Sequence, residues 1–279
     1  MQYTEQVRLH YGASRYGASK LRFRGPQRRA DGEYIAFLGG SEVYGKFVER
    51  PVSDRVETAL KLPCLNLGCM NAGLDAFLKD PSALDVAGRS VATVIQITGA
   101  QNNSNRFYVV HPRRNDRLVT ASPALQALFP AVDFGDVHYT RHALHELLAA
   151  SAERFDLVVD ELKTAWVKRM ELLLSMIPGP KLLLRMARYD LSETGSLRAG
   201  DPLFVDADML AALSGQIDGL VDYTLSEKAA SEGVSGMIFG PEDEPAARCL
   251  LGAQAHAEAA DMLIAPLRKL CRRKQIRAA

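Results

Sequence analysis

The chain of 279 residues carries 34 Lys and Arg against 33 Asp and Glu, a formal net charge of +1. This balance argues against a protein that nucleic acid or a membrane attracts through its overall field. The hydrophobic content of 47% with 24% charged residues is that of a soluble protein, long enough for one large α/β domain or two small ones. No apolar run approaches the length of a membrane span, the N-terminus lacks the apolar core of a signal peptide, and the four cysteines show neither metal spacing nor a compact disulfide pattern. We therefore expect a cytoplasmic protein that binds neither membrane nor nucleic acid.

The N-terminal 32 residues are polar, rich in Arg, Gly and Tyr, and show no clear period. They predict an arm, residues 1–32, ahead of a single domain that comprises residues 33–279. Within the arm, residues 22–29 (RFRGPQRR) include Phe23 and Pro26, which offer apolar anchors. We expect this part of the arm to lie against the domain near its first strand.

Apolar, strand-like runs bounded by glycine then alternate with helical patterns. The runs predict five strands at residues 34–40, 64–68, 91–99, 181–187 and 219–225. Helices are predicted at 53–62, at 71–88 with a break at Pro81, from about 140, at 155–177, and finally at 245–272; Trp166 belongs to the apolar stripe of the fourth and is assigned to the core. Continuous apolar strands between helices are typical of a parallel sheet that is covered on both faces. The sequence therefore predicts an α/β three-layer sandwich with a five-stranded, mostly parallel sheet.

Residues 100–150 interrupt this alternation with many Asn, Arg and His residues. An insertion of this length after a strand more often serves a function than a passive connection. We predict that it forms a cap over the carboxyl edge of the sheet.

Polar residues follow three of the predicted strands, at the edge where a doubly wound sheet binds its ligands. Ser41 follows the first strand, Gly68 ends the second, and Gln101, Asn102 and Asn103 follow the third. The last helix can pack beside the first strand and bring His256 toward Ser41. Acyl transfer needs a hydroxyl, an imidazole that accepts its proton, and N–H groups that stabilise the oxyanion. We thus predict Ser41 and His256 as catalytic residues, with an oxyanion hole from the Ser41 and Gly68 N–H groups and the amide of Gln101 or Asn102.

The same segments resemble a known family. GGS at 39–41, NLG at 66–68, GAQN at 99–102 and the histidine of GAQAHAEAADML resemble the four blocks of the SGNH (GDSL) hydrolases. The resemblance implies a flavodoxin-like three-layer fold and an esterase, a lipase, or an acetyl-ester hydrolase or transferase that acts on carbohydrates. More specifically, RFRGP at 22–26, the HPRRNDR segment that ends at residue 117, and DPLFVDADML at 201–210 resemble an uncharacterised bacterial family without assigned activity.

The chain departs from the SGNH pattern at acidic positions. Gly40 stands where the family has Asp before its serine, and Ala253 stands where it has Asp three residues before its histidine. Gln101 and Asn102 replace the Asn and Asp of the third block. The histidine therefore has no local carboxylate to orient it, which leaves a dyad, or an orienting carboxylate from Glu242, Asp243 or Glu244, as the alternatives.

Several of these residues have a plainer interpretation. Ser41 would also serve as the N-cap of the next helix. His138, His142 and His145 share one helical face, but a single helix seldom supplies three zinc ligands, so no metal site and no cofactor are predicted. The cap is rich in arginine, and guanidinium groups bind carboxylate, phosphate or sulfate unless nearby Asp residues pair with them. The predicted substrate-binding residues are Asn103, Arg106, Arg113, Arg114, Arg117 and Arg141.

Two functions remain open at this level. The first is a serine-dependent ester hydrolase or acyl transferase that acts on an anionic, carbohydrate-linked small molecule or glycan. The second is a remodelled SGNH-like protein that binds an anionic glycan or a nucleotide-type ligand without acyl chemistry. Ser41 and His256 favour the first, and Gly40 and Ala253 favour the second. The sequence leaves open whether the protein forms a homo-oligomer.

Overall fold

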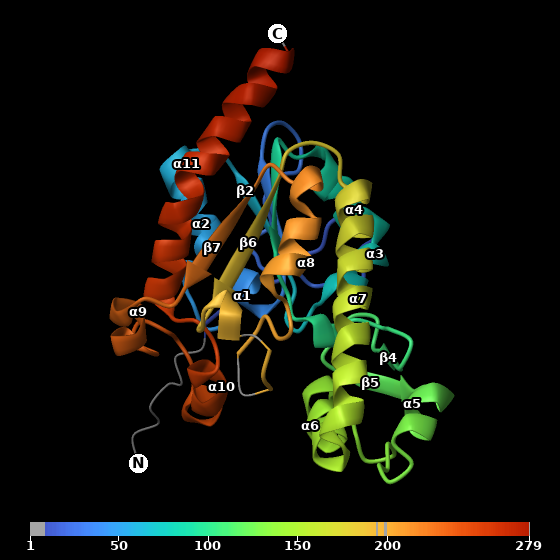
Figure 1. Ribbon diagram of the computed structural model, residues 1–279. Coiled ribbons are helices and arrows are strands. Elements are labelled where there is room, and N and C mark those ends of the chain that lie inside the picture. Colours follow the sequence, from blue (N-terminus) through green and yellow to red (C-terminus); the bar gives the residue numbers. More distant parts are fainter. Residues whose placement is uncertain (1–8, 194, 198–199, 279) are drawn as a thin grey trace, which may run out of the picture.

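Five parallel strands form the centre of the fold (Figure 1). The computed structural model describes residues 9–193, 195–197 and 200–278. The strands lie in the order β2-β1-β3-β6-β7, and every pair among them is parallel. Their bounds are β1 Ile35–Gly39, β2 Cys64–Gly68, β3 Ala92–Gln96, β6 Lys181–Ala187 and β7 Gly219–Thr224. The predicted α/β class, the parallel sheet and its five strands are confirmed.

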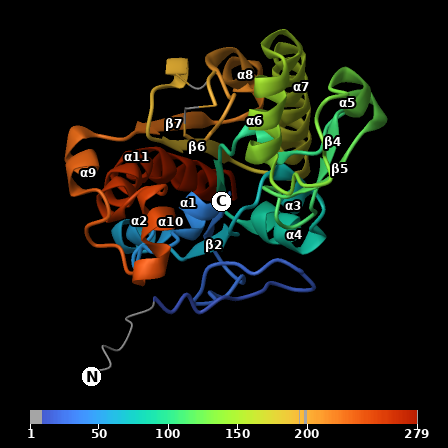
Figure 2. The ribbon, with the colours of Figure 1, turned by 90° about the horizontal axis from the view of Figure 1, so that it is seen from below.

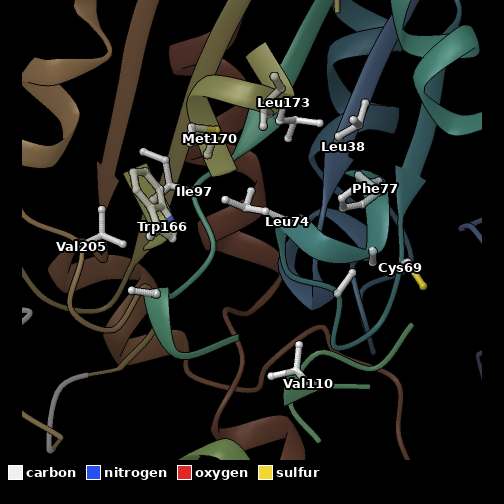
Figure 3. Packing of buried hydrophobic residues seen from close by; sticks show 14 of the residues in the cluster. Leu38, Cys69, Leu74, Phe77, Ile97, Val110, Trp166, Met170, Leu173 and Val205 are labelled. Atoms are coloured by element: carbon white, nitrogen blue, oxygen red, sulfur yellow. The ribbon is translucent and has the colours of Figure 1, made fainter. Parts of the chain in front are cut away.

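Helices cover both faces of this sheet, as its continuous apolar strands require. One face packs against α3 (Leu74–Leu78), α4 (Pro81–Arg89) and α7 (Ala152–Met176), where Trp166, Met170 and Leu173 lie near Ile97 and Leu74 (Figure 3). The predicted assignment of Trp166 to the core is correct, and its indole N–H donates to the Thr98 carbonyl at 2.8 Å. The opposite face packs against α2 (Val52–Leu60), α9 (Glu227–Glu232) and α11 (Ala253–Ala278).

Two predicted helices are each divided in the structure. The 71–88 segment forms α3 and α4, because Pro81 begins a new helix that the Asp80 side chain caps by accepting from the Ala83 N–H. The C-terminal segment forms α10 (Glu244–Arg248) and α11, with residues 249–252 between them. His256 therefore lies in the first turn of α11 rather than in the middle of a continuous helix.

Residues 100–150 contain more regular structure than the sequence predicted. After the 3₁₀ turn η1 (Ala100–Asn102) they form an antiparallel hairpin, β4 (Tyr108–Val110) and β5 (Leu118–Ala121), and then α5 (Pro123–Leu128) and α6 (Thr140–Ala150). Figure 1 shows this segment at the end of the molecule toward which β6 and β7 point. The sequence did not predict β4 and β5, because each strand has only three or four residues. The remaining elements are α1 (Ser41–Tyr44), α8 (Ala207–Ala212), η2 (Leu191–Glu193), η3 (Ser214–Gln216) and η4 (Pro241–Asp243).

The described part of the N-terminal arm, residues 9–32, lies along the outer edge of β2 (Figure 2). Phe23 is fully buried, and the Arg24 N–H donates to the Gly68 carbonyl at 3.3 Å. The Arg24 guanidinium donates to four carbonyls between Tyr44 and Glu49, at 2.9 to 3.4 Å. The predicted packing of residues 22–29 against the domain is therefore correct, but the contacted strand is β2 and not the first strand. Phe23 and Arg24 are the anchors, whereas Pro26 is exposed. Residues 1–8 of the predicted arm lie outside the described residues.

Among the described helices, none is both long enough and apolar enough to cross a lipid bilayer.

Candidate functional site

Ser41 is the first residue of α1 and is not its N-cap. The N-cap is Gly40, which has no side chain to satisfy the first N–H groups of the helix. Gln96, at the end of the neighbouring strand β3, replaces that side chain: its Oε1 accepts from the Gly40 N–H at 2.9 Å and from the Val43 N–H at 3.1 Å. The plainer interpretation of Ser41 as a cap is therefore wrong, and its hydroxyl is available for another role.

Helix α3 begins in the same way on the other side of Ser41. Its N-cap is Gly73, and the Oδ1 of Asn115 accepts from the Gly73 N–H at 2.7 Å and from the Ala76 N–H at 3.1 Å. Glycine is required at this position, because a Cβ on Gly73 would lie 2.4 Å from the Asn102 carbonyl oxygen. A cap that the glycine cannot supply thus comes from a side chain distant in the sequence.

Among the residues that the structure describes, Asn71 is the one to which the Ser41 hydroxyl is hydrogen-bonded. Its Oγ accepts from the Asn71 backbone N–H at 3.2 Å and lies 3.3 Å from the Asn71 Oδ1, to which it can donate. Asn71 adopts the left-handed conformation with φ 60°, which Asn tolerates better than most residues and which directs its N–H toward the serine. Ser41 is half-buried, so the hydroxyl is presented at the carboxyl edge of the sheet beside a backbone donor.

His256 does not face Ser41, and this corrects the central prediction. The imidazole is 1% exposed, and its Nδ1 accepts from the Val52 N–H, the first N–H of α2, at 3.2 Å. In neutral histidine the other nitrogen then carries the proton, so Nε2 is a donor. It has no hydrogen-bond partner among the described residues and lies 3.9 Å from Oε2 of Glu42. A general base for Ser41 would need an unprotonated nitrogen directed at the hydroxyl, and neither nitrogen meets that condition.

Glu42 and His256 form an uncharged pair at neutral pH. Burial, with further contributions from the charges of Arg55 and Arg24, lowers the pKa of His256 to about 3. Burial raises the pKa of Glu42 to about 8, although the hydrogen bond from the Leu251 N–H and the charge of Arg188 oppose this shift. Both groups are therefore neutral near pH 7.

The Glu42 carboxyl group also links α1 to the segment before α11. Both Glu42 oxygens lie 3.3 Å from the Leu251 nitrogen. Arg188, just after β6, donates to the carbonyls of Arg248 and Leu250 at 2.7 and 2.6 Å. The carboxylates proposed from sequence to orient His256 do not contact it in the described structure; Glu244, for example, pairs with Arg248.

The predicted oxyanion donors do not converge. The Gly68 N–H donates to Oδ1 of Asn66 at 2.8 Å and so is already used within β2. The Gln101 Nε2 donates to Asp201 at 2.8 Å, and the Asn102 Oδ1 accepts from the Thr140 hydroxyl at 3.0 Å. Asn103, predicted to bind substrate, is fully buried, and its Nδ2 donates to the Ala100 carbonyl. These amides hold the loop after β3 in place, and the Asn71 N–H is the donor that reaches Ser41.

The five predicted arginines separate into two groups. Arg106 pairs with Glu161 and lies over the Phe107 ring; Arg117 lies over Tyr139; and Arg141 contacts Asp201. Arg113 and Arg114 are exposed, and neither forms a salt bridge with any residue that the structure describes. Burial raises the pKa of the Cys69 thiol, and the charge of Arg114 opposes this rise, so the guanidinium is close enough to act on the loop between β2 and α3.

The structure offers no metal site in the part of the chain that it describes, since no group of three or more His, Cys, Asp or Glu side chains there is suited to a metal ion. Helix α6 begins at Thr140, so His138 precedes it, and His142 lies 3.5 Å from Glu146 one turn later.

The sequence prediction missed the residues that build this site: Glu42, Asn71, Gln96 and Asn115. Asn71, in the turn after the second predicted strand, carried a recognisable signal, since Asn next to small residues favours the left-handed conformation. The two capping amides carried none, because their partners lie 53 to 56 and 39 to 42 residues away.

Comparison with known proteins gives two solved structures and one family. The lipase Lip_vut3 from a goat rumen metagenome shares 14% identity over 84% of this chain and 96% of its own, with a TM-score of 0.40. A protein from Lactobacillus plantarum shares 16% identity over 85% of this chain and 97% of its own, with a TM-score of 0.36. With scores below 0.5, neither structure bears on the activity. No curated protein matches this chain. The model of a domain of unknown function, DUF6473, matches residues 1–271, and the chain therefore belongs to the DUF6473 family.

Proposed function

We propose that the protein binds an anionic small molecule or glycan at the carboxyl edge of its sheet. The site lies between the Ser41–Asn71 pair and the basic loop, residues 111–117. The observation that carries the proposal is the position of this loop: the Asn115 N–H donates to the Asn71 carbonyl at 2.9 Å, and Asn71 in turn contacts Ser41. This contact supports a position of Arg113 and Arg114 near the half-buried Ser41 and the exposed Asn71.

The chemistry of these groups specifies the ligand class. A guanidinium group with no carboxylate partner binds carboxylate, phosphate or sulfate through paired N–H donors. Ser41 and Asn71 add a hydroxyl and an amide, which suit the hydroxyl groups of a sugar. Under this proposal residues 100–150 act as a cap on a single domain, and His256 takes no part in chemistry.

A thermal-shift titration tests the proposal. Inorganic phosphate, sulfate and a sugar phosphate should each raise the melting temperature at constant ionic strength, because a ligand that binds only the folded state stabilises it. The Arg114→Ala variant should lose most of this shift. The matched control is Arg268→Ala, which removes an exposed arginine of α11 and should keep the shift. Equal shifts in the two variants would show that the anion binds elsewhere.

A second candidate is a serine-dependent ester hydrolase or acyl transferase that acts on the same anionic class. The observation in its favour is the 3.2 Å contact between the Ser41 Oγ and the Asn71 N–H, since such a donor can stabilise an oxyanion that forms on an attacked carbonyl. This chemistry would need a base other than His256. A fluorophosphonate probe should label the wild type and not Ser41→Ala if the serine is activated, and absence of labelling in both would leave the binding function alone.

A further inference from the structure

Asn115 is a fully buried residue within the otherwise accessible basic loop. Pro112, Arg113, Arg114 and Arg117 are exposed, whereas Asn115 is 0% exposed. Its backbone and side chain form four hydrogen bonds: to the Asn71 carbonyl at 2.9 Å, from the Gly73 N–H at 2.7 Å, from the Ala76 N–H at 3.1 Å, and to the His111 carbonyl at 2.8 Å. Every polar group of the amide therefore has a partner, which is the arrangement that fixes a buried side chain in one rotamer.

The basic loop is also closed upon itself. The His111 Nδ1 accepts from the N–H groups of Arg113 and Arg114 at 3.3 and 3.1 Å, and the His111 N–H donates to the Arg117 carbonyl at 2.8 Å. These bonds fix the backbone from which both arginines extend. The bond from the Asn115 side chain to the His111 carbonyl closes the same turn from within, so a change of this side chain is felt by the backbone that carries both arginines.

Among the described residues, Asn115 thus links the basic loop to the candidate site through both its backbone and its side chain. The backbone of Asn115 holds Asn71, and its carboxamide holds the first turn of α3, which directly follows Asn71 and Gly73. We propose that Asn115 is a positioning residue for anion binding: it holds Arg113 and Arg114 in a fixed place beside Ser41 and Asn71. This inference rests on the proposed function. A ligand that meets preorganised arginines does not have to order them on binding, and this raises its affinity.

The test compares two variants, Asn115→Ala and Asn115→Asp, with the wild type in ¹⁵N-labelled form. Arginine Nε–Hε signals are followed while inorganic phosphate, and separately sulfate, is added at constant ionic strength. In the wild type the signals of Arg113 and Arg114 should move with the anion and yield a dissociation constant. Both variants should bind about tenfold more weakly, the range expected when one well-placed charged contact is lost. The same signals should shift in the variants before any anion is added.

The aspartate variant separates position from stability. It keeps the acceptor for the Gly73 and Ala76 N–H groups but cannot donate to His111, so it should recover much of the melting temperature that the alanine variant loses while binding stays weak. Because its carboxylate also repels an anion, the positioning role is judged on the affinity of the alanine variant. His256→Ala is the control for destabilisation as such, because it leaves the basic loop untouched and should bind normally. If the wild type binds neither anion at Arg113 and Arg114, the proposed function itself fails. If the wild type binds and the alanine variant binds within twofold of it, the positioning role is wrong while the binding function stands.

Discussion

The pH dependence of stability tests the uncharged pair of Glu42 and His256. The pKa of Glu42 is raised from 4.5 to about 8, so the folded protein holds this proton more tightly than the unfolded chain. The stabilisation from Glu42 is complete below pH 4.5 and is lost as the pH rises through 8. The pKa of His256 is lowered from 6.5 to about 3, so its contribution is complete above pH 6.5 and is lost as the pH falls toward 3.

The two effects cancel over part of the range. Between pH 4.5 and 6.5 a rise in pH removes stabilisation that comes from Glu42 and adds a similar stabilisation from His256. The contribution of the pair to the free energy of unfolding is therefore almost independent of pH in this range. From pH 6.5 to 8 only Glu42 contributes. This window of about 1.5 pH units, at about 1.4 kcal/mol per unit, corresponds to a loss of about 2 kcal/mol in the free energy of unfolding.

Urea denaturation of the wild type and of Glu42→Gln at pH 6.5 and pH 8.5 measures this loss. Glutamine keeps an acceptor for the Leu251 N–H and cannot ionise, so its stability should fall by about 2 kcal/mol less than that of the wild type between the two pH values. Glu244→Gln, which removes an exposed carboxylate paired with Arg248, should follow the wild type. Parallel slopes for wild type and Glu42→Gln would refute the assignment of a buried, protonated Glu42.

Substitutions at three positions test further contacts of the structure. His256→Ala should lower the free energy of unfolding by roughly 3 kcal/mol, because it leaves a cavity and a Val52 N–H without an acceptor. His256→Asn retains an acceptor and should therefore lower the free energy of unfolding by less. Equal losses of the two variants in urea denaturation would contradict the hydrogen bond between His256 and Val52. Gln96→Leu should cost about 1–2 kcal/mol and speed amide hydrogen exchange at Val43, and unchanged exchange there would show that α1 is capped in another way. Arg24→Ala should expose the arm to limited proteolysis under native conditions, since it removes a guanidinium that donates to four carbonyls. Wild-type resistance would mean that the other contacts of the arm, such as Phe23 and the Arg28–Glu57 pair, are sufficient to hold it.

The sheet was predictable because each of its strands is a short apolar run bounded by glycine or proline. A strand that is buried on both faces needs apolar residues throughout. Because this requirement concerns consecutive residues, it is visible in the sequence. The same holds for α7, whose apolar stripe predicted the position of Trp166 in the core. The hairpin β4–β5 was missed because its strands are short and half-exposed, which leaves no pattern of sufficient length.

The site was less predictable, because its residues are fixed by partners that lie far away in the chain. The strand ends correctly located Ser41 and the loop after β3 at one edge of the sheet. They did not specify which amides would serve the backbone. Gln101 and Asn102 bond to side chains far away in the chain, and Asn103 bonds within its own loop. Gln96, by contrast, caps α1 from within a strand. The sequence alone does not distinguish an amide side chain that satisfies buried N–H groups from one that is available to a ligand.

The surroundings of His256 favour the proposed binding function over acyl transfer that uses this histidine as the base. A base in acyl transfer must accept a proton. Burial of the His256 imidazole disfavours its protonated form, and the charges of Arg55 and Arg24 disfavour it further. The imidazole also lies in the first turn of α11, where the helix dipole opposes a positive charge. With a pKa of about 3, protonating it at pH 7 costs about 5 kcal/mol, which is more than three powers of ten in rate before any bond is broken. The unprotonated Nδ1 of His256 also accepts a hydrogen bond from the Val52 N–H, and this bond would have to break before Nδ1 could turn toward Ser41. Any acyl chemistry at Ser41 must therefore use a base other than His256, whereas the anion binding that we propose for Arg113 and Arg114 does not depend on His256.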